Sequence, residues 1–325
     1  MYPKGTRMIR KLAALLGVAL SITAAPVFAQ QNAMRIIVAF PPGGPVDFVA
    51  RSIAEQLGKE LGQRVIVENK AGANGAIAAE TVMRAAPDGT TLWLTSVGAA
   101  AINPSLYDKL PYDMKADFAP VSQVVNNVEL MVVNINDPAS DAAQFVAAAK
   151  RRSDPTPFAS TGIGSIPHFA MEQLKDSGKV NLLHVPYKGA APAITDLIGG
   201  QVAGFFGDVP GLINHVRSGR LKAVGIADSK RHPLLPDVKT LAEQGLPGVD
   251  SSNWYALFAP AKTPAATIDR LSAAVRRVVA DPKVNERLAS NGAQPKSSSP
   301  QELAELLDSD TTKWANMIKA KGIKR

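Results

Sequence analysis

The 325-residue chain is basic, with 36 lysine and arginine residues against 28 aspartate and glutamate residues, and it contains no cysteine. Without cysteine, disulfides, thiol nucleophiles, iron–sulfur ligation and a lipid-modified N-terminal cysteine are excluded. The positive residues are scattered and aromatic residues make up only 6% of the chain, which argues against nucleic-acid binding. The length suits two domains better than a single core.

The first segment has the pattern of a secretory signal peptide. Four positive residues precede a short apolar run over residues 12–27, and "VFAQ" places Ala29 at a cleavage position before Gln30. The run is short for a membrane-spanning helix. We therefore expect residues 1–29 to be cleaved and the mature chain, residues 30–325, to be a free periplasmic protein.

Short apolar segments alternate with helical patterns along the mature chain. An irregular section over residues 103–120 interrupts this alternation, and a long β-rich run over residues 121–135 follows it. The expected strands cover residues 34–40, 64–69, 91–96, 121–135, 158–161, 180–186, 202–208, 221–227 and 251–260. The expected helices cover residues 46–61, 74–86, 141–151, 167–178, 191–200 and 211–219, with three more starting near Thr267, Asp281 and Ser299.

This order of elements predicts an α/β protein with mostly parallel, doubly wound sheets. The interruption and the restart indicate two α/β units, the second inserted within the first. We expect one lobe to comprise residues 30–126 plus 227–325 and the other residues 127–226. The chain would cross between them near Val124–Val133 and Leu221–Ala227, an arrangement that forms a cleft with a hinge.

The segment "PPGGPVD" joins the first expected strand to a helix. Pro45 suits the first helical position, and Gly43 and Gly44 permit a sharp turn and the close approach of a ligand. The first amides of a helix lack internal partners and carry the positive end of the dipole, so a carboxylate or phosphate would fit there. The alternative is a tight loop whose amides are capped by Asp47 or by water. The sequence leaves both open.

Similar glycine- and hydroxyl-rich loops follow other strands. In an open α/β sheet the ligand crevice lies at the carboxyl ends of the strands, where such loops gather. Several of them from two facing units predict a polar small-molecule site in a cleft. The loop residues concerned are Gly72, Asn74 and Gly75, Ser96 and Gly98, Thr161, Gly162, Gly164 and Ser165, and Gly189.

No residue pattern indicates catalysis or a metal. The histidines are His168, His184, His215 and His232, and their spacing is not that of a metal site. We expect His184 in the core and His215 and His232 at the surface, whereas His168 either touches ligand or orients its loop. There is no G-x-S-x-G nucleophile elbow, although a triad built from distant residues stays open. Tyr255 is expected to pack in the core or to face the cleft.

Several longer motifs resemble a known family. "FPPGGPVDFVAR", "VIVENKAGANG", "STGIGSIPH", "HVPYKGAAPAITDLIGGQV" and "WYALFAPAKTP" are similar, in order, to Bug-type solute-binding receptors of tripartite tricarboxylate transporters. The resemblance implies a two-lobed type II periplasmic binding-protein fold, no cofactor, and capture of a small organic carboxylate for delivery to a membrane permease.

The same resemblance assigns site residues. The first anion loop falls on Pro42, Gly43, Gly44 and Asp47, the second on Ala73, Asn74 and Gly75, and the facing wall on Thr161, Gly162, Gly164, Ser165 and His168. Ser96 and Asp208 complete the candidate set. The chain departs from the family pattern at Pro45 and Val46, where hydroxyl residues are usual, and at Gly207, where an acid is usual. If Asp208 reaches the ligand, it would favour an amino or hydroxyl group and oppose a second carboxylate.

These observations favour a non-catalytic, monomeric receptor whose lobes close on a carboxylate. A sensor that docks on a two-component receptor kinase would use the same cleft, and an enzyme on an α/β scaffold is the third hypothesis. The sequence does not choose among aromatic, aliphatic, mono- and dicarboxylate ligands.

Overall fold

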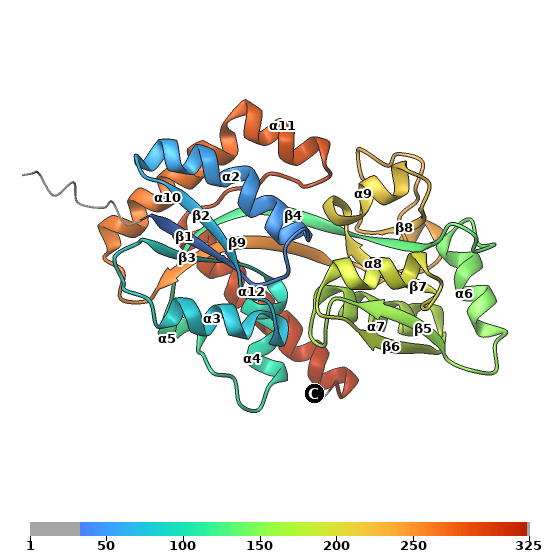
Figure 1. The fold of residues 1–325 in the computed structure, drawn as a ribbon. Helices are drawn as coiled ribbons and strands as arrows, with labels where there is room; N and C mark the ends of the chain where they lie inside the picture. The colour runs from blue at the N-terminus through green and yellow to red at the C-terminus, as the bar shows by residue number, and fades with distance from the viewer. Residues whose placement is uncertain (1–32, 324–325) are drawn as a thin grey trace, which may run out of the picture. The chain divides into compact units, whose positions relative to one another are not determined.

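The computed structural model describes residues 33–323, so the predicted signal peptide lies outside the described residues. Within residues 33–323, nine strands form a sheet in the order β2-β1-β3-β9-β4-β7-β5-β6, and β8 pairs with β4 (Figure 1). The strands are β1 (Met34–Val38), β2 (Val65–Asn69), β3 (Thr91–Ser96), β4 (Phe118–Asn134), β5 (Thr156–Ser160), β6 (Leu182–Pro186), β7 (Gly204–Asp208), β8 (Leu221–Ala227) and β9 (Ser252–Pro260).

Helices connect these strands in nearly the predicted order. The helices are α2 (Pro45–Leu61), α3 (Ala76–Met83), α4 (Asn103–Leu106), α5 (Met114–Asp117), α6 (Ala142–Lys150), α7 (Ile166–Gly178), α8 (Ala190–Ile198), α9 (Val209–Arg217), α10 (Ala265–Ala280), α11 (Pro282–Ser290) and α12 (Pro300–Lys321). Short turns of helix, η1 (Ala73–Gly75), η2 (Gly98–Ile102) and η3 (Ala242–Gln244), complete the set. None of the helices in the described part of the chain combines the length and the apolar character that crossing a membrane requires.

Strand β4 links the two parallel parts of the sheet. It pairs antiparallel with β9 from Phe118 to Val128, and with β7 and β8 from Glu129 onward. The strands on one side (β2, β1, β3) and on the other (β7, β5, β6) pair in parallel. Figure 1 shows β4 running from the first group to the second. Strand β8 ends at Ala227, which pairs with Glu129 of β4, and β9 begins at Ser252, which pairs with the adjacent Val128. The chain therefore leaves β4 after Ala227 and pairs with it again from Ser252 onward.

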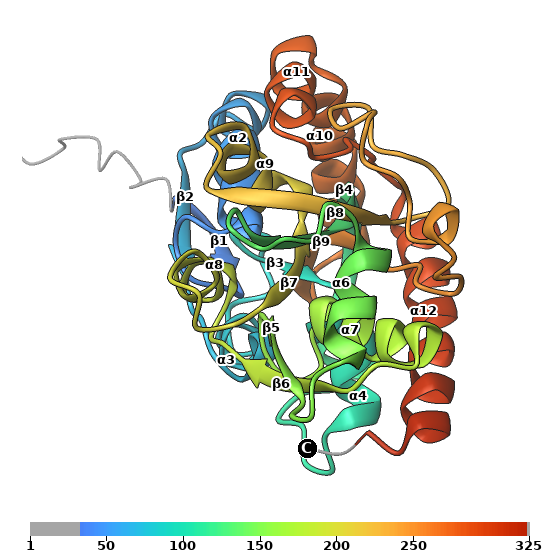
Figure 2. The same cartoon turned by 90° about the vertical axis from the view of Figure 1, so that its right-hand side faces the viewer.

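The two faces of the sheet are covered because apolar residues occupy both sides of its central strands. In β9, Tyr255 and Leu257 pack with α2 and α10 on one face, whereas Trp254 and Phe258 pack with α3 and α12 on the other. Figure 1 shows α2, α10 and α11 on one side of these strands. Figure 2 shows α12 beside α7, where the ring centroids of Trp314 and Phe169 are 5.2 Å apart.

The helix boundaries follow from the local sequence. Helix α2 has Pro45 in its first turn and ends at Gly62, which takes the left-handed conformation (φ 67°) that glycine tolerates. Helix α12 begins with a capping box in which Ser299 and Glu302 satisfy each other's backbone N–H groups. The expected helix starts are therefore confirmed.

One expectation about the fold is wrong. His232 was expected at the surface, but it is only 4% exposed. Its Nε2 donates to the carbonyl oxygen of Gly292 (3.2 Å), and its Nδ1 accepts from the amide of Leu234 (3.2 Å). The histidine fastens the loop after β8 to the end of α11, a contact between distant segments that the local pattern does not reveal.

Candidate functional site

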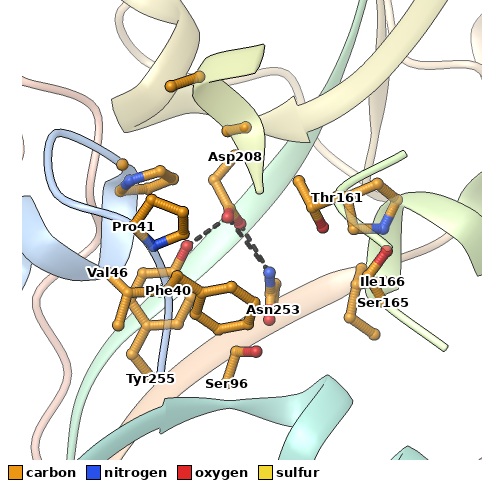
Figure 3. A pocket seen from close by; sticks show the side chains of 15 residues that line it. Phe40, Pro41, Val46, Ser96, Thr161, Ser165, Ile166, Asp208, Asn253 and Tyr255 are labelled. Carbon is orange, nitrogen blue, oxygen red and sulfur yellow. Dashed lines mark hydrogen bonds between the residues drawn. The ribbon is translucent and has the colours of Figure 1, made fainter. Parts of the chain in front are cut away.

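A cavity lies where the strands of the sheet end (Figure 3). Its volume is about 30 Å³, which is room for very few water molecules. A second cavity of about 190 Å³ lies next to it and shares Phe40, Pro41 and Thr161. The strand-end residues that line the first cavity are Phe40 and Pro41 after β1, Ser96 in β3, Thr161 after β5 and Asp208 in β7, with Asn253 and Tyr255 from β9.

Three helices begin at the same cavity. Their first residues line it: Gly44, Pro45 and Val46 at α2, Ser165, Ile166 and Pro167 at α7, and Ala190 and Ala191 at α8. The N-cap residues of α2 and α8 make no side-chain cap hydrogen bond. The first amides of a helix lack partners within it and mark the positive end of its dipole. Since no lysine or arginine occurs among the described lining residues, these helix ends are the source of positive potential in the cavity.

The first predicted loop is held in place by Asp47. Its Oδ2 accepts from the amide of Gly43 (3.0 Å) and from Arg51 Nε (2.9 Å), and its Oδ1 accepts from Asn69 Nδ2 (2.9 Å). Burial alone would raise the pKa of Asp47, but these hydrogen bonds outweigh it and lower the pKa. Of this loop, Gly44 lines the first cavity, whereas Pro42, Gly43 and Asp47 do not. The carboxylate therefore positions the loop, as the capping alternative anticipated.

The second predicted loop lines the neighbouring cavity. Ala73, Asn74 and Gly75 adopt positive φ angles of 47°, 46° and 92°, a region that glycine enters freely, asparagine tolerates and other residues rarely adopt. The Asn74 amide donates to Asn103 Oδ1 (2.9 Å), and Asn103 Nδ2 donates back to the Asn74 carbonyl (3.1 Å). This reciprocal pair fixes the left-handed turn and leaves the loop as part of the wall.

The facing wall is built on the start of α7. Ser165 Oγ accepts from the amide of His168 and caps the helix. The amide of Gly164 donates to His168 Nδ1 (3.2 Å), and the His168 ring stacks on His184 with centroids 3.9 Å apart. Burial lowers the pKa of His168 to about 4 and that of His184 to about 3, so both rings are neutral at pH 7.

Within this wall, Thr161 and Ser165 line the first cavity, Thr161 and Gly162 line the second, and Gly164 and His168 line neither. His168 thus orients its loop, one of the two roles expected for it. His184 is half-buried, and its Nε2 lies 2.6 Å from Ser160 Oγ.

Asp208 lies at the centre of a buried cluster of polar side chains. Tyr255 Oη donates to Asp208 Oδ2, and Asn253 Nδ2 donates to Oδ1 (3.0 Å) and Oδ2 (3.2 Å), as the dashed lines in Figure 3 mark. Glu129, fully buried and paired opposite Asp208 in the β4–β7 ladder, accepts from the same amide at 3.3 Å. Burial raises the pKa of Asp208 to about 7 although its hydrogen bonds oppose the rise. Burial and the charge of Asp208 raise the pKa of Glu129 well above its usual range.

Sequence reasoning missed two members of this cluster. Glu129 stands in an apolar strand with no local signal, and only the register of β4 against β7 places it opposite Asp208. Asn253 precedes Trp254 and Tyr255, and alternation along β9 puts it on the same face as Tyr255. The same alternation decides between the two positions expected for Tyr255, which lines the cavity, whereas Trp254 points to the other face and its Nε1 donates to Asp310 (2.7 Å).

Comparison with known proteins assigns the chain to a family. Residues 49–323 match the family described as "Tripartite tricarboxylate transporter family receptor". The chain belongs to this family. It is 35% identical to protein BugT of Bordetella pertussis over 322 residues, covering 97% of this chain and 98% of BugT.

Solved structures agree with this assignment. The chain is similar to the periplasmic binding protein BugD (TM-score 0.85, 34% identity, 90% of this chain and 98% of BugD). It is also similar to MatC from Rhodopseudomonas palustris, solved with bound malate (TM-score 0.83, 34% identity, 88% and 98%). These matches confirm the predicted family and the α/β binding-protein fold. Because the family consists of solute-binding receptors, they also confirm that this solute-binding protein is not an enzyme.

In the described part of the chain, no group of three or more histidine, aspartate or glutamate side chains is arranged to hold a metal ion. The structure brings five of the predicted site residues together at the first cavity and places four others at the second, which Thr161 also lines. The five are Gly44, Ser96, Thr161, Ser165 and Asp208, and the four are Ala73, Asn74, Gly75 and Gly162.

Proposed function

We propose that this protein is a periplasmic receptor that captures a small organic carboxylate in the cavity at the strand ends. The observation that carries the proposal is the convergence of the α2, α7 and α8 N-termini on a cavity whose described lining contains no lysine or arginine. A carboxylate there would accept hydrogen bonds from main-chain amides and from the hydroxyls of Ser96, Thr161 and Ser165. The malate bound to the related MatC is a ligand of this chemical class.

Ligand entry requires the cavity to open. A volume of about 30 Å³ is far below the roughly 300 Å³ at which small-molecule pockets begin. We propose that residues 30–126 plus 227–325 form one lobe and residues 127–226 the other. Their hinge would lie where β4 passes from β9 to β7 and β8, near Val128. The two lobes close on the ligand and merge the neighbouring cavities into one site.

The delivery partner is the membrane permease of a tripartite tricarboxylate-type transporter, as the family description indicates. The N-terminal pattern of residues 1–29 would direct secretion to the periplasm. We propose that the receptor acts as a monomer, because the closure of two lobes of one chain on the ligand needs no second copy.

Thermal melting of the purified protein against a panel of acids tests the proposal. The panel contains malate, succinate, adipate and benzoate, with their primary amides as neutral controls. A ligand at about a hundred times its dissociation constant adds about 2.7 kcal/mol to the free energy of unfolding, which raises the melting temperature measurably. We expect stabilisation by one class of acid and none by its amide. Stabilisation by the amides alone, or by no acid of any class, would contradict the proposal.

A further inference from the structure

The Glu129–Asp208 pair places two carboxyl groups at the wall of a cavity that is proposed to take an anion. Asp208 lines the cavity and is 7% exposed, whereas Glu129 lies behind it and is fully buried. Like charges this close in a buried site do not both ionise, so the pair retains a proton. One oxygen of the pair, Glu129 Oε2, has no hydrogen-bond partner among the described residues.

The groups that face Asp208 are few. Strand β4 contributes Glu129, and β9 contributes Asn253 and Tyr255. The helix ends that share the cavity contribute Pro45 and Val46, Ser165 to Pro167, and Ala190 and Ala191, none of which titrates. Among residues 33–323, no lysine or arginine forms an ion pair with either carboxyl. A ligand carboxylate in this cavity would therefore meet a negative charge that no cation of the cavity lining offsets, since Lys188 lines the neighbouring cavity.

We propose that the Glu129–Asp208 pair takes up a proton when a carboxylate binds and that Asp208, in its neutral form, donates a hydrogen bond to the ligand. This inference rests on the proposed function. The proton comes from the solvent and stays on Asp208, and no bond within the ligand changes. Oδ2 accepts from both Tyr255 and Asn253, whereas Oδ1 accepts from Asn253 alone, so Oδ1 keeps room for the proton that is donated to the ligand.

The sign of the linkage follows from the charges. Burial already holds the pKa of Asp208 at about 7 in the free protein, and a bound anion raises it further because the charged form is then repelled by the ligand as well as disfavoured by burial. The affinity for the carboxylate is therefore highest below about pH 7, and it decreases by up to about tenfold for each pH unit above that. A ligand that presented an ammonium group to Asp208 would show the opposite dependence.

Replacement of Asp208 by asparagine separates this mechanism from a structural role. Asparagine has the shape of the neutral acid, and its amide is a permanent donor. If the charge of Asp208 opposes the ligand, Asp208→Asn binds at about pH 8 at least as tightly as wild type, and its affinity is the same at about pH 6. A matched control is Asp310→Asn, because Asp310 is a half-buried carboxyl whose pKa is also raised by burial, on the opposite face of β9.

Calorimetric titration in HEPES and Tris at about pH 8 counts the protons taken up, because the two buffers have different enthalpies of ionisation. The probe is whichever acid of the panel binds. We expect about 0.5 to 1 proton taken up by wild type and by Asp310→Asn, and none by Asp208→Asn. Wild-type binding without proton uptake, or uptake that persists in Asp208→Asn, would overturn the inference while leaving the carboxylate receptor intact. No binding by any acid would remove the proposed function and this inference together. Should Asp208→Asn fail to fold, the wild-type proton count alone decides.

Discussion

Replacement of Asp47 by alanine should lower both the free energy of unfolding and the affinity for ligand, although Asp47 does not line the cavity. Its carboxylate, with the side chain 5% exposed, accepts hydrogen bonds from the Gly43 amide, from Arg51 and from Asn69. Asp47→Ala removes all three hydrogen bonds, so the Gly43 main-chain amide and the Asn69 side-chain amide must donate to water instead. The loop that carries Gly44 to the cavity then loses its tie to β2 and α2.

The magnitude follows from these contacts. A hydrogen bond to a charged group contributes about 1.5–3 kcal/mol, and the contributions are not additive when partners share one acceptor. Arg51 is half-exposed, so its ion pair is screened and adds little. We expect Asp47→Ala to lower the free energy of unfolding by about 2–4 kcal/mol. Urea unfolding at pH 7 measures this value, and Glu55→Ala is the control because its ion pair with Lys59 is exposed, so we expect no resolvable change there.

The binding readout distinguishes loop positioning from global instability. At a temperature where Asp47→Ala remains folded, we expect its dissociation constant for the captured acid to rise by about tenfold or more, because the loop must be ordered on binding. Asp47→Asn retains an acceptor for Gly43 and should fall between wild type and alanine. A variant as stable as wild type, or one that binds with unchanged affinity, would refute the role assigned to Asp47.

Other predictions concern the cavity wall, the histidine stack and a helix cap. Gly44→Val should fold, because φ is −82° and an added Cβ meets only one backbone oxygen at 3.5 Å, yet it should weaken binding by at least about tenfold in calorimetry by filling the cavity wall. His168→Ala should cost about 1–2 kcal/mol in urea unfolding, since the Gly164 amide loses its acceptor. Because the pKa of His168 is lowered to about 4 in the folded protein, the unfolded chain binds a proton at a higher pH than the folded chain does. The free energy of unfolding should therefore decrease as the pH is lowered from about 6.5 to about 4, and it should decrease less in His168→Phe. Ser299→Ala should cost about 1 kcal/mol through loss of the α12 cap, with a smaller loss arguing that tertiary packing alone holds the helix start.

The sequence was sufficient where local chemistry decides the structure. Pro45 and the apolar stripe of α2, the Ser299 cap of α12 and the alternation of strands and helices all predicted elements that the structure contains. The loops at the strand ends were also identified, because glycine and hydroxyl residues mark them without knowledge of the partners.

What the sequence could not supply was the pairing of distant strands. Glu129 becomes a partner of Asp208 only through the β4–β7 register, and Asn253 joins them only because β9 lies beside β4. For the same reason the sequence did not show that Asp47 and His168 turn toward their own loops rather than into the cavity. Their orientation depends on contacts with Arg51, Asn69 and His184. Local patterns identified the candidate residues. The pairing of distant strands then determined which of them line the cavity and which hold its loops in place.

If helix N-termini and main-chain amides recognise the anionic carboxylate, loss of the ligand's charge should weaken binding. The ratio of the dissociation constants for the tightest-binding acid and for its primary amide measures this loss. Helix N-termini contribute up to about 2 kcal/mol to a buried anion and hydrogen bonds to charged groups about 1.5–3 kcal/mol, so the acid should bind at least about 30-fold more tightly. Equal affinities, or tighter binding of the amide, would contradict recognition of the charge.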